Sequence, residues 1–308
     1  MRSWGTRGML RMIACPSTAR GAALAVALLS AACASTAPRP EGPAVAVPER
    51  VFFVEGGAGR LHVSDGGGGG TPVLFLHGLG ADLECWRPQL DHLRPGRRAI
   101  AYDHRGHGGS DPARDGVYTV AALADDLELV VQALALDRFY LVGHSLSGAL
   151  LTMYAAKHQE KVAGLVYADA VGDFHAMAPQ QVEAMKLRQG SASFGKPQQR
   201  EAFEQMLVSA RPATRERVLA ALDQLDTPAF PALRSSLAEF SAAELLPRYG
   251  GPRLAIEVAG FGTPVLFSSL DKKAPRITIP GVSHWLMLDD PDAFNRALDP
   301  FIAFKPGR

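Results

Sequence analysis

Apolar residues gather in short runs that alternate with amphipathic stretches along most of the chain. Runs of Val, Leu, Ile and Phe with the length of strands lie at 73–76, 99–102, 139–142 and 163–167. The stretches at 83–93, 120–136 and 148–157 repeat their apolar positions with the period of a helix. Near-continuous apolar strands alternating with helices predict an α/β fold, with a mostly parallel sheet covered by helices on both faces.

The pattern differs on either side of this region. Short apolar runs at 51–54 and 61–63, separated by Gly-rich turns, predict an antiparallel ribbon that leads into the sheet. Between residues 173 and 247 the strands vanish, and helical patterns follow one another at 179–187, 196–209, 213–224 and 231–240. Strand patterns resume at 253–259 and 276–279, with a helix-like stretch at 263–273 and a closing helix at 292–304. The sequence thus predicts a core at 51–172 and 248–305, with a small helical cap inserted at 173–247.

The first 33 residues have the layout of an export signal. Four Arg without an acidic residue precede an apolar run at 21–32, which is too short to span a bilayer. The run ends in Leu-Ser-Ala-Ala-Cys33, which resembles the lipobox of bacterial lipoproteins and implies acylation of Cys33. We expect a lipid-anchored protein that faces the periplasm or the exterior. An ordinary cleaved signal, with Cys33 incidental, would instead give a secreted or periplasmic protein.

Composition narrows the range of partners and of covalent cross-links. Residues 34–50 are rich in Pro and small residues and are expected to form an extended tether. Lys and Arg number 32 against 31 Asp and Glu, so the net charge of +1 gives no electrostatic footprint for nucleic acid, and a membrane is expected only through the lipid anchor. The folded body keeps one cysteine, Cys85, so it forms no internal disulfide, and we interpret Cys85 as a packed small hydrophobe.

A short motif with candidate chemistry joins an apolar strand to a helix. It reads Gly143-His-Ser145-Leu-Ser147-Gly148. A sharp strand-to-helix turn needs small residues two places before and after its central Ser, which Gly143 and Ser147 supply, although Gly is commoner at the second place. We therefore predict that Ser145 is a nucleophile; as a helix N-cap alone it would leave the rest of the motif unexplained.

This motif and three others resemble the α/β-hydrolase fold family, over residues 51–304. His77-Gly-Leu79-Gly80 is similar to the family's HG-x-G loop, and residues 103–111 are similar to its DxRGHGxSD turn, which is mostly structural. The resemblance implies that the backbone N–H groups of Leu79 and Leu146 bind the oxyanion. Residues 281–284 are similar to its G-x-x-H loop, which makes His284 the general base.

The acid of the triad departs from the commonest pattern of that family. The turn after 253–259 reads Gly-Phe-Gly-Thr and has no carboxylate, whereas one strand earlier Asp169 stands at a strand end. Certain haloalkane dehalogenases of this fold take their acid from that strand, so Asp169 is our choice. Asp173, Glu257 and Asp271 remain competitors, the last if residues 264–269 form the penultimate strand.

The resemblance implies acyl transfer on a carboxylic ester or related small molecule, with no metal or organic cofactor. A Ser nucleophile argues against epoxide hydrolysis and dehalogenation, whose relatives use Asp. Alternatives are a hydrolase of C–C bonds or a perhydrolase with the same triad, or a binding protein of this fold that has lost turnover. Apolar side chains of the cap that are available to line a pocket are Phe174, Met177, Met185, Phe194, Phe203 and Met206.

Overall fold

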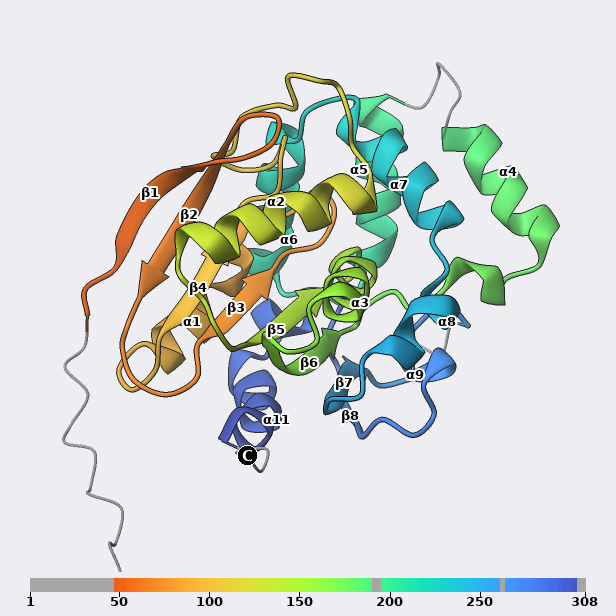
Figure 1. Cartoon of the computed structure of the whole chain (residues 1–308). Helices are drawn as coiled ribbons and strands as arrows, with labels where there is room; N and C mark the ends of the chain where they lie inside the picture. Colours follow the sequence, from red (N-terminus) through yellow and green to blue (C-terminus); the bar gives the residue numbers. More distant parts are fainter. Residues whose placement is uncertain (1–46, 190–194, 261–263, 304–308) are drawn as a thin grey trace, which may run out of the picture. The chain divides into compact units, whose positions relative to one another are not determined.

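A twisted sheet forms the centre of the computed structural model, which describes residues 47–189, 195–260 and 264–303 (Figure 1). The described residues give eight strands in the order β1-β2-β4-β3-β5-β6-β7-β8. Their bounds are β1 (Arg50–Glu55), β2 (Arg60–Gly66), β3 (Val73–Leu76), β4 (Ala99–Tyr102), β5 (Phe139–His144), β6 (Val162–Ala168), β7 (Arg253–Val258) and β8 (Arg276–Ile279). β1 and β2 run antiparallel to each other, β2 is antiparallel to β4, and the remaining strands are parallel. The predicted ribbon and the mostly parallel sheet are confirmed.

Helices cover both faces of the sheet. α2 (Val120–Ala133) and α3 (Ser147–Lys157) pack together on one face, and α1 (Arg87–Leu93) and α11 (Pro291–Ala303) pack together on the other (Figure 1). α11 begins at a Pro directly after Asp290, whose side chain accepts a hydrogen bond of 3.0 Å from the Ala293 N–H. Asp290 is therefore the helix N-cap that this Asp-Pro pair suggests.

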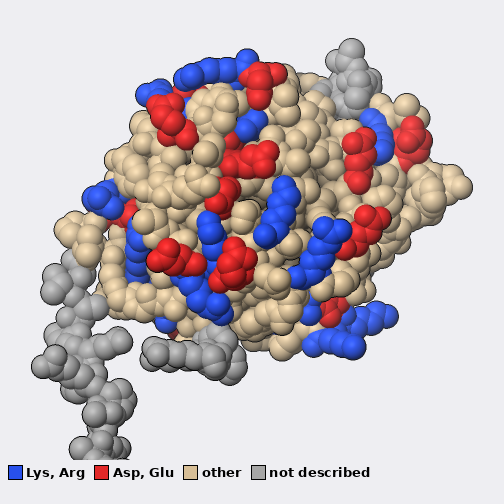
Figure 2. All heavy atoms as spheres, in the orientation of Figure 1, with Lys and Arg blue, Asp and Glu red and all other residues tan. Residues whose placement is uncertain are grey.

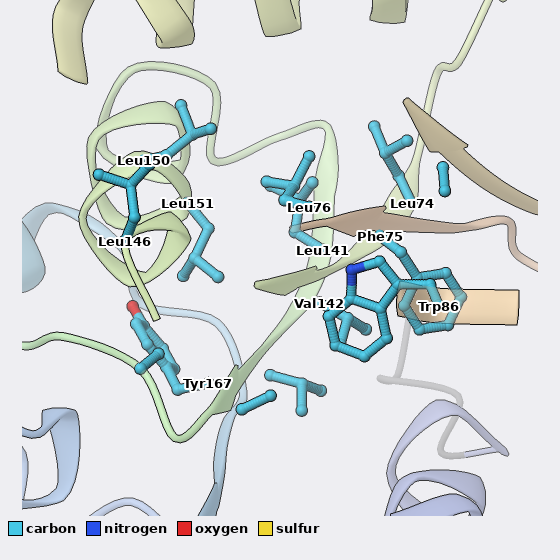
Figure 3. Close-up of a cluster of buried hydrophobic side chains, with 14 of the residues drawn as sticks. Leu74, Phe75, Leu76, Trp86, Leu141, Val142, Leu146, Leu150, Leu151 and Tyr167 are labelled. Carbon is cyan, nitrogen blue, oxygen red and sulfur yellow. The ribbon is translucent and has the colours of Figure 1, made fainter. Parts of the chain in front are cut away.

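The core lies where the central strands meet α3 (Figure 3). β3, β5 and β6 are buried along their whole length, as expected for strands covered on both sides. Each fully buried large apolar side chain contributes about 1.5–3 kcal/mol to the stability of the fold. Labelled members of this cluster are Leu74, Phe75, Leu76, Trp86, Leu141, Val142, Leu146, Leu150, Leu151 and Tyr167. This packing fixes the ends of the central strands relative to one another.

Between β6 and β7 the described residues form helices and no strand. They are η2 (Phe174–Ala176), α4 (Pro179–Gln189), α5 (Lys196–Met206), α6 (Pro212–Gln224), α7 (Ala229–Glu239), α8 (Ala242–Leu245) and η3 (Leu246–Arg248). We call residues 173–247 the cap. Polar contacts tie it to the core: Arg217 pairs with Asp82, and the Tyr118 hydroxyl donates to Asp226.

One predicted element is shorter than its pattern suggested. Within the helix-like stretch at 263–273, the described residues 264–273 contain only α9 (Phe267–Leu270), and Leu266 forms a β-bridge with Val171. The Phe267 N–H donates to the Ala170 carbonyl at 3.0 Å, so this backbone pairs with the loop after β6 instead of continuing a helix. Residues 264–269 form no named strand, and β7 is the strand next to β8, as predicted.

The predicted signal, Cys33 and most of the tether lie outside the described residues. Within the described ranges, no helix combines the length and apolarity that crossing a bilayer requires. Figure 2 shows cationic and anionic side chains interspersed over one face of the molecule, in keeping with the near balance of 32 basic and 31 acidic residues. This face therefore offers no large patch of one sign.

Candidate active site

The candidate catalytic residues follow strands that end at the same edge of the sheet. β3 lies between β4 and β5, so the chain leaves β3 toward one side of the sheet and later returns on the other. Ligands of open α/β sheets bind in the crevice that such a switch of direction opens at the carboxyl ends of the strands. The loops that carry His77, Ser145, Asp169 and His284 follow β3, β5, β6 and β8, respectively.

Ser145 occupies a strained turn between β5 and α3. Its φ angle is 53°, in the left-handed region that side chains rarely adopt. The turn is held because the Ser145 carbonyl accepts hydrogen bonds from the N–H groups of Gly148 and Val171, both at 3.0 Å. Ser145 borders a cavity under the cap. The backbone thus directs the Ser145 side chain outward, as a nucleophile elbow does.

Close contacts on both sides of this turn leave room only for small residues at Gly143 and Gly148. A Cβ atom at Gly148 would overlap the Val171 carbonyl oxygen, and one at Gly143 would overlap a Leu151 methyl group. Ser147, which stands where Gly is commoner, is fully buried, and its hydroxyl donates to the His77 carbonyl at 2.6 Å. The departure from Gly therefore adds a bond between the elbow and the loop after β3.

The loop after β3 passes directly over the elbow. A Cβ atom at Gly78 would lie 2.8 Å from His144 Nδ1 and 3.0 Å from Ser145 Cβ, so this close approach requires Gly. Leu79, the next residue, borders the cavity beside Ser145. Leu146 immediately precedes α3, and N–H groups at a helix start lack acceptors within the helix. Both residues predicted to donate to an oxyanion thus lie beside Ser145.

His284 and Asp169 form a direct hydrogen bond. His284 Nδ1 lies 2.6 Å from Asp169 Oδ2, and the Asp169 side chain is fully buried. The other Asp169 oxygen accepts a bond of 3.2 Å from the Val258 N–H at the end of β7. Because the carboxylate accepts from Nδ1–H, the proton of the neutral ring lies on Nδ1 and the Nε2 lone pair is available.

The ring of His144 supports the loop that carries His284. His144 Nε2 donates to the His284 carbonyl at 2.8 Å, and the two rings lie 4.5 Å apart. Burial, reinforced by the neighbouring His284, lowers the pKa of His144 well below its ordinary value. His144 is therefore a neutral donor that positions the loop.

The other carboxylates considered for the triad bind elsewhere. None of the three has a hydrogen bond or ion pair with His284 among the described residues. Their partners include the Ala243 N–H for Asp173 (3.1 Å), Arg276 for Glu257 (2.7 Å) and Arg253 for Asp271 (3.2 Å). Only Asp169 is brought together with His284.

A second carboxylate, Asp289, links the His284 loop to the cap. One Asp289 oxygen accepts from the Ser283 N–H at 2.7 Å and also from the Ser283 hydroxyl. The other oxygen accepts from the Arg211 N–H of the cap at 2.9 Å. Asp289 is buried, so these hydrogen bonds, and not water, stabilise its negative charge.

Three buried histidines, His77, His104 and His107, pack against one another behind the loop after β3, with their rings tilted or edge to face. His77 Nδ1 donates to the Gly78 carbonyl at 2.8 Å, and its Nε2 accepts from the His104 N–H at 3.0 Å. Burial and the neighbouring rings lower the pKa of His104 to about 3 and that of His107 to about 3. The pKa of His77 is lowered for the same reasons. We call this group the histidine cluster; its rings are neutral and support the loop.

The cavity beside Ser145 has a volume of about 190 Å³ and walls from both core and cap. The core supplies Leu79, His144, Ser145, His284 and Trp285, and the cap supplies Ala202, Phe203, Met206, Phe230 and Arg234. Two of the cap side chains suggested by the sequence, Phe203 and Met206, are therefore in the wall, whereas Phe194 lies outside the described residues.

Sequence reasoning missed Phe230 and Arg234 in this wall. Their spacing of four residues on α7 is the only sequence signal for them, because it places both side chains on one face of a helix. No feature of the sequence indicates that this face points toward Ser145. In the described part of the chain, no group of three or more His, Cys, Asp or Glu is arranged to hold a metal ion.

Comparisons with known proteins identify the family of this fold. A family model described as the alpha/beta hydrolase fold matches residues 71–229. Epoxide hydrolase 3 from Xenopus tropicalis is 37% identical over 36% of this chain and 31% of its own length. The non-heme chloroperoxidase CPO-A1 from Kitasatospora aureofaciens is 41% identical over 30% of this chain and 33% of its own length. The chain thus spans about a third of the length of these relatives.

Solved structures resemble nearly the whole described body. The enol-lactonase from Burkholderia xenovorans LB400 has a TM-score of 0.70 at 20% identity, over 82% of this chain and 100% of that one. A hydrolase from Pseudomonas aeruginosa PA01 has a TM-score of 0.70 at 22% identity, over 83% of this chain and 99% of that one. At these identities the likeness concerns the fold.

Proposed function

Because the chain belongs to the alpha/beta hydrolase fold family, we propose that it is a serine hydrolase that cleaves carboxylic esters through an acyl-enzyme. One observation carries the proposal: Ser145 in its strained turn borders the same cavity as His284, whose Nδ1 is bonded to the buried Asp169. A nucleophile, a base and a group that orients the base are the parts that this chemistry needs.

The first half of the reaction forms the acyl-enzyme. Ser145 Oγ attacks the ester carbonyl carbon while His284 Nε2 accepts its proton, and the carbonyl oxygen becomes an oxyanion. The N–H groups of Leu79 and Leu146 stabilise that charge. The C–O bond to the alcohol then breaks, and the imidazolium returns the proton to the leaving oxygen.

The second half releases the acid. Water attacks the acyl carbon as His284 accepts one of its protons, and the bond to Ser145 Oγ breaks as that proton passes to Oγ. In both halves Asp169 keeps the ring in the tautomer with Nδ1–H and stabilises the imidazolium. The Val258 N–H bonded to Asp169 holds the carboxylate in line with the ring.

An ester is preferred over the reactions in the names of the relatives. Epoxide opening in this fold uses an Asp nucleophile, and this chain has Ser145 at the corresponding turn. A C–C bond hydrolase or a perhydrolase would share the triad, and a binding protein would keep the cavity without turnover. Hydrolysis of a fluorogenic short-chain ester separates the enzyme from the binding protein.

The nucleophile is tested by labelling with a fluorophosphonate. Wild type should be labelled and should hydrolyse the ester, whereas Ser145→Ala should do neither and should retain the circular dichroism of wild type. Ser209→Ala changes an exposed serine of the cap and serves as the control, with full labelling. Undiminished labelling of Ser145→Ala would refute the assignment.

The acid is tested by four amide substitutions measured side by side. Asp169→Asn should lower kcat by about 10⁴, because an amide holds the histidine in the wrong tautomer. Asp173→Asn, Glu257→Gln and Asp271→Asn should each cost far less. Near wild-type kcat for Asp169→Asn, together with a loss of kcat by orders of magnitude in another variant, would assign the acid to the residue changed in that variant.

A further inference from the structure

The wall of the cavity beside Ser145 is mostly apolar. Six of its ten residues have apolar side chains, namely Leu79, Ala202, Phe203, Met206, Phe230 and Trp285. The other four are His144, Ser145, Arg234 and His284. A wall of this composition favours an apolar group, because each CH₂ placed against it leaves water. The chemistry of ester cleavage does not require such a wall, so the wall bears on which ester is bound.

Phe203, on α5, occupies a central place in this wall. A Cβ atom at Gly80 would lie 2.7 Å from Phe203 Cζ, so the tip of the ring rests on the loop after β3. The ring centre lies 5.5 Å from that of Trp285, on the loop after β8, and 6.1 Å from that of Phe230 on α7. These distances are typical of packed aromatic pairs. One side chain of the cap therefore contacts both catalytic loops and is held on three sides.

We propose that Phe203 closes the acyl end of the cavity and sets the longest acyl chain that the enzyme accepts, so that its substrates are esters of short apolar carboxylic acids. This inference rests on the proposed function and names its substrate class. The acyl group stays bound to Ser145 Oγ until water releases it, whereas the alcohol leaves before that water enters. The apolar space next to Ser145 therefore suits the acyl chain, and the alcohol lies toward the opening.

The volume of the cavity limits the length of that chain. It is about 190 Å³, and a protein cavity of about 150 Å³ holds one benzene molecule. The space beside Ser145 therefore accommodates an acyl group of about four to six carbons. A longer chain would meet the Phe203 ring, which Gly80 and Trp285 hold in place.

A series of p-nitrophenyl esters from acetate to dodecanoate tests this limit, with active sites counted by fluorophosphonate labelling. In wild type, kcat/KM should rise about three- to fourfold for each added CH₂, as the burial of a CH₂ predicts, and should fall beyond about four to six carbons. Phe203→Ala removes a ring of the size of benzene and should move the maximum to acyl chains longer by about two to four carbons. The kcat/KM ratio of octanoate to butyrate should rise about tenfold or more.

Further variants test the position and the direction of the effect. Phe203→Leu is a milder change that should shift the maximum the same way by less, and it carries the test if Phe203→Ala fails to fold. Ala202→Leu adds an isopropyl group to the same wall and should move the maximum to shorter chains. Phe240→Leu changes a buried phenylalanine of the cap that does not line the cavity, and it should keep the wild-type maximum.

A second series separates the acyl group from the alcohol. It keeps the acetyl group and lengthens the alcohol from ethyl to octyl, and its profile should be the same in wild type and in the Phe203 variants. A shift of the maximum in this alcohol series, or an unchanged acyl maximum in folded Phe203→Leu and Phe203→Ala, would overturn the inference while ester hydrolysis stands. Absence of both labelling and ester hydrolysis in wild type would instead overturn the proposed function and this inference with it.

Discussion

Acidification from about pH 7.5 to about pH 5.5 is expected to weaken the fold through the histidine cluster. The pKa of His104 and that of His107 are each about 3 in the folded protein, because burial and neighbouring rings disfavour the charged form. In the unfolded chain a histidine titrates near 6.5. Below that pH the unfolded chain binds protons at these histidines, whereas the folded protein does not. The contribution of the neutral histidines to the free energy of unfolding is therefore complete above about pH 6.5 and is lost as the pH falls toward about 3.

The magnitude follows from the linkage relation. Between about pH 7.5 and pH 5.5, each histidine that stays neutral in the folded protein lowers the free energy of unfolding by about 1.4 kcal/mol. His104 and His107 together contribute about 3 kcal/mol, and His77 and His144, whose pKa values are lowered in the same direction, add to this. The loss is large against a total stability of about 5–15 kcal/mol.

Urea unfolding followed by circular dichroism at both pH values measures the effect. His107→Gln removes one titrating ring, and the difference between the two pH values should shrink by about 1.4 kcal/mol, whatever the variant loses at the higher pH. His158→Gln changes a half-buried histidine outside the cluster and serves as the control. An undiminished pH difference in His107→Gln would show that the ring accepts a proton within the folded protein, contrary to the reasoning.

Three further outcomes are expected. Gly78→Ala should lower kcat/KM for a short ester by about 10² while the fold persists, because its Cβ would press on His144 and Ser145; unchanged kinetics would contradict the close approach. Cys85 is buried and burial raises its pKa, so a thiol reagent should modify it only after unfolding, which a titration with and without urea measures. We propose that Cys33 is acylated after export; a palmitate analogue should label wild type and leave Cys33→Ala unlabelled, and equal labelling of the two would refute lipidation.

The strands could be predicted because they are short apolar runs, and most helices because their apolar positions repeat with the period of a helix. The run at 99–102 is fully buried in β4, and the pattern at 120–136 became α2, three residues shorter. The helix predicted at 263–273 is mostly absent for a physical reason. The Phe267 N–H donates to the carbonyl of Ala170, a partner nearly a hundred residues earlier, instead of to a carbonyl within a helix. A periodic pattern in sequence contains no information about such a partner.

The candidate site likewise contains residues that the sequence predicts and residues that only the structure places. Ser145 and His284 stand in motifs that are local in sequence. Asp169 could be chosen only by resemblance to certain haloalkane dehalogenases, which take their acid from the same strand end, and three other carboxylates remained competitors. Phe230 and Arg234 could not be predicted as wall residues, because their place in the wall depends on which face of α7 points toward the cavity. That orientation is set by the packing of the cap, which only the three-dimensional structure contains.

Asp289 has a consequence for engineering the protein. Its two oxygens bind the backbone of the His284 loop and of the cap, at Ser283 and Arg211. Replacing the cap with one from another hydrolase, to import a different specificity, would remove the Arg211 N–H and leave half of a buried anion without its donor. The penalty would fall on the loop that carries His284. A successful chimera therefore needs a backbone donor at the start of the helix that takes the place of α6.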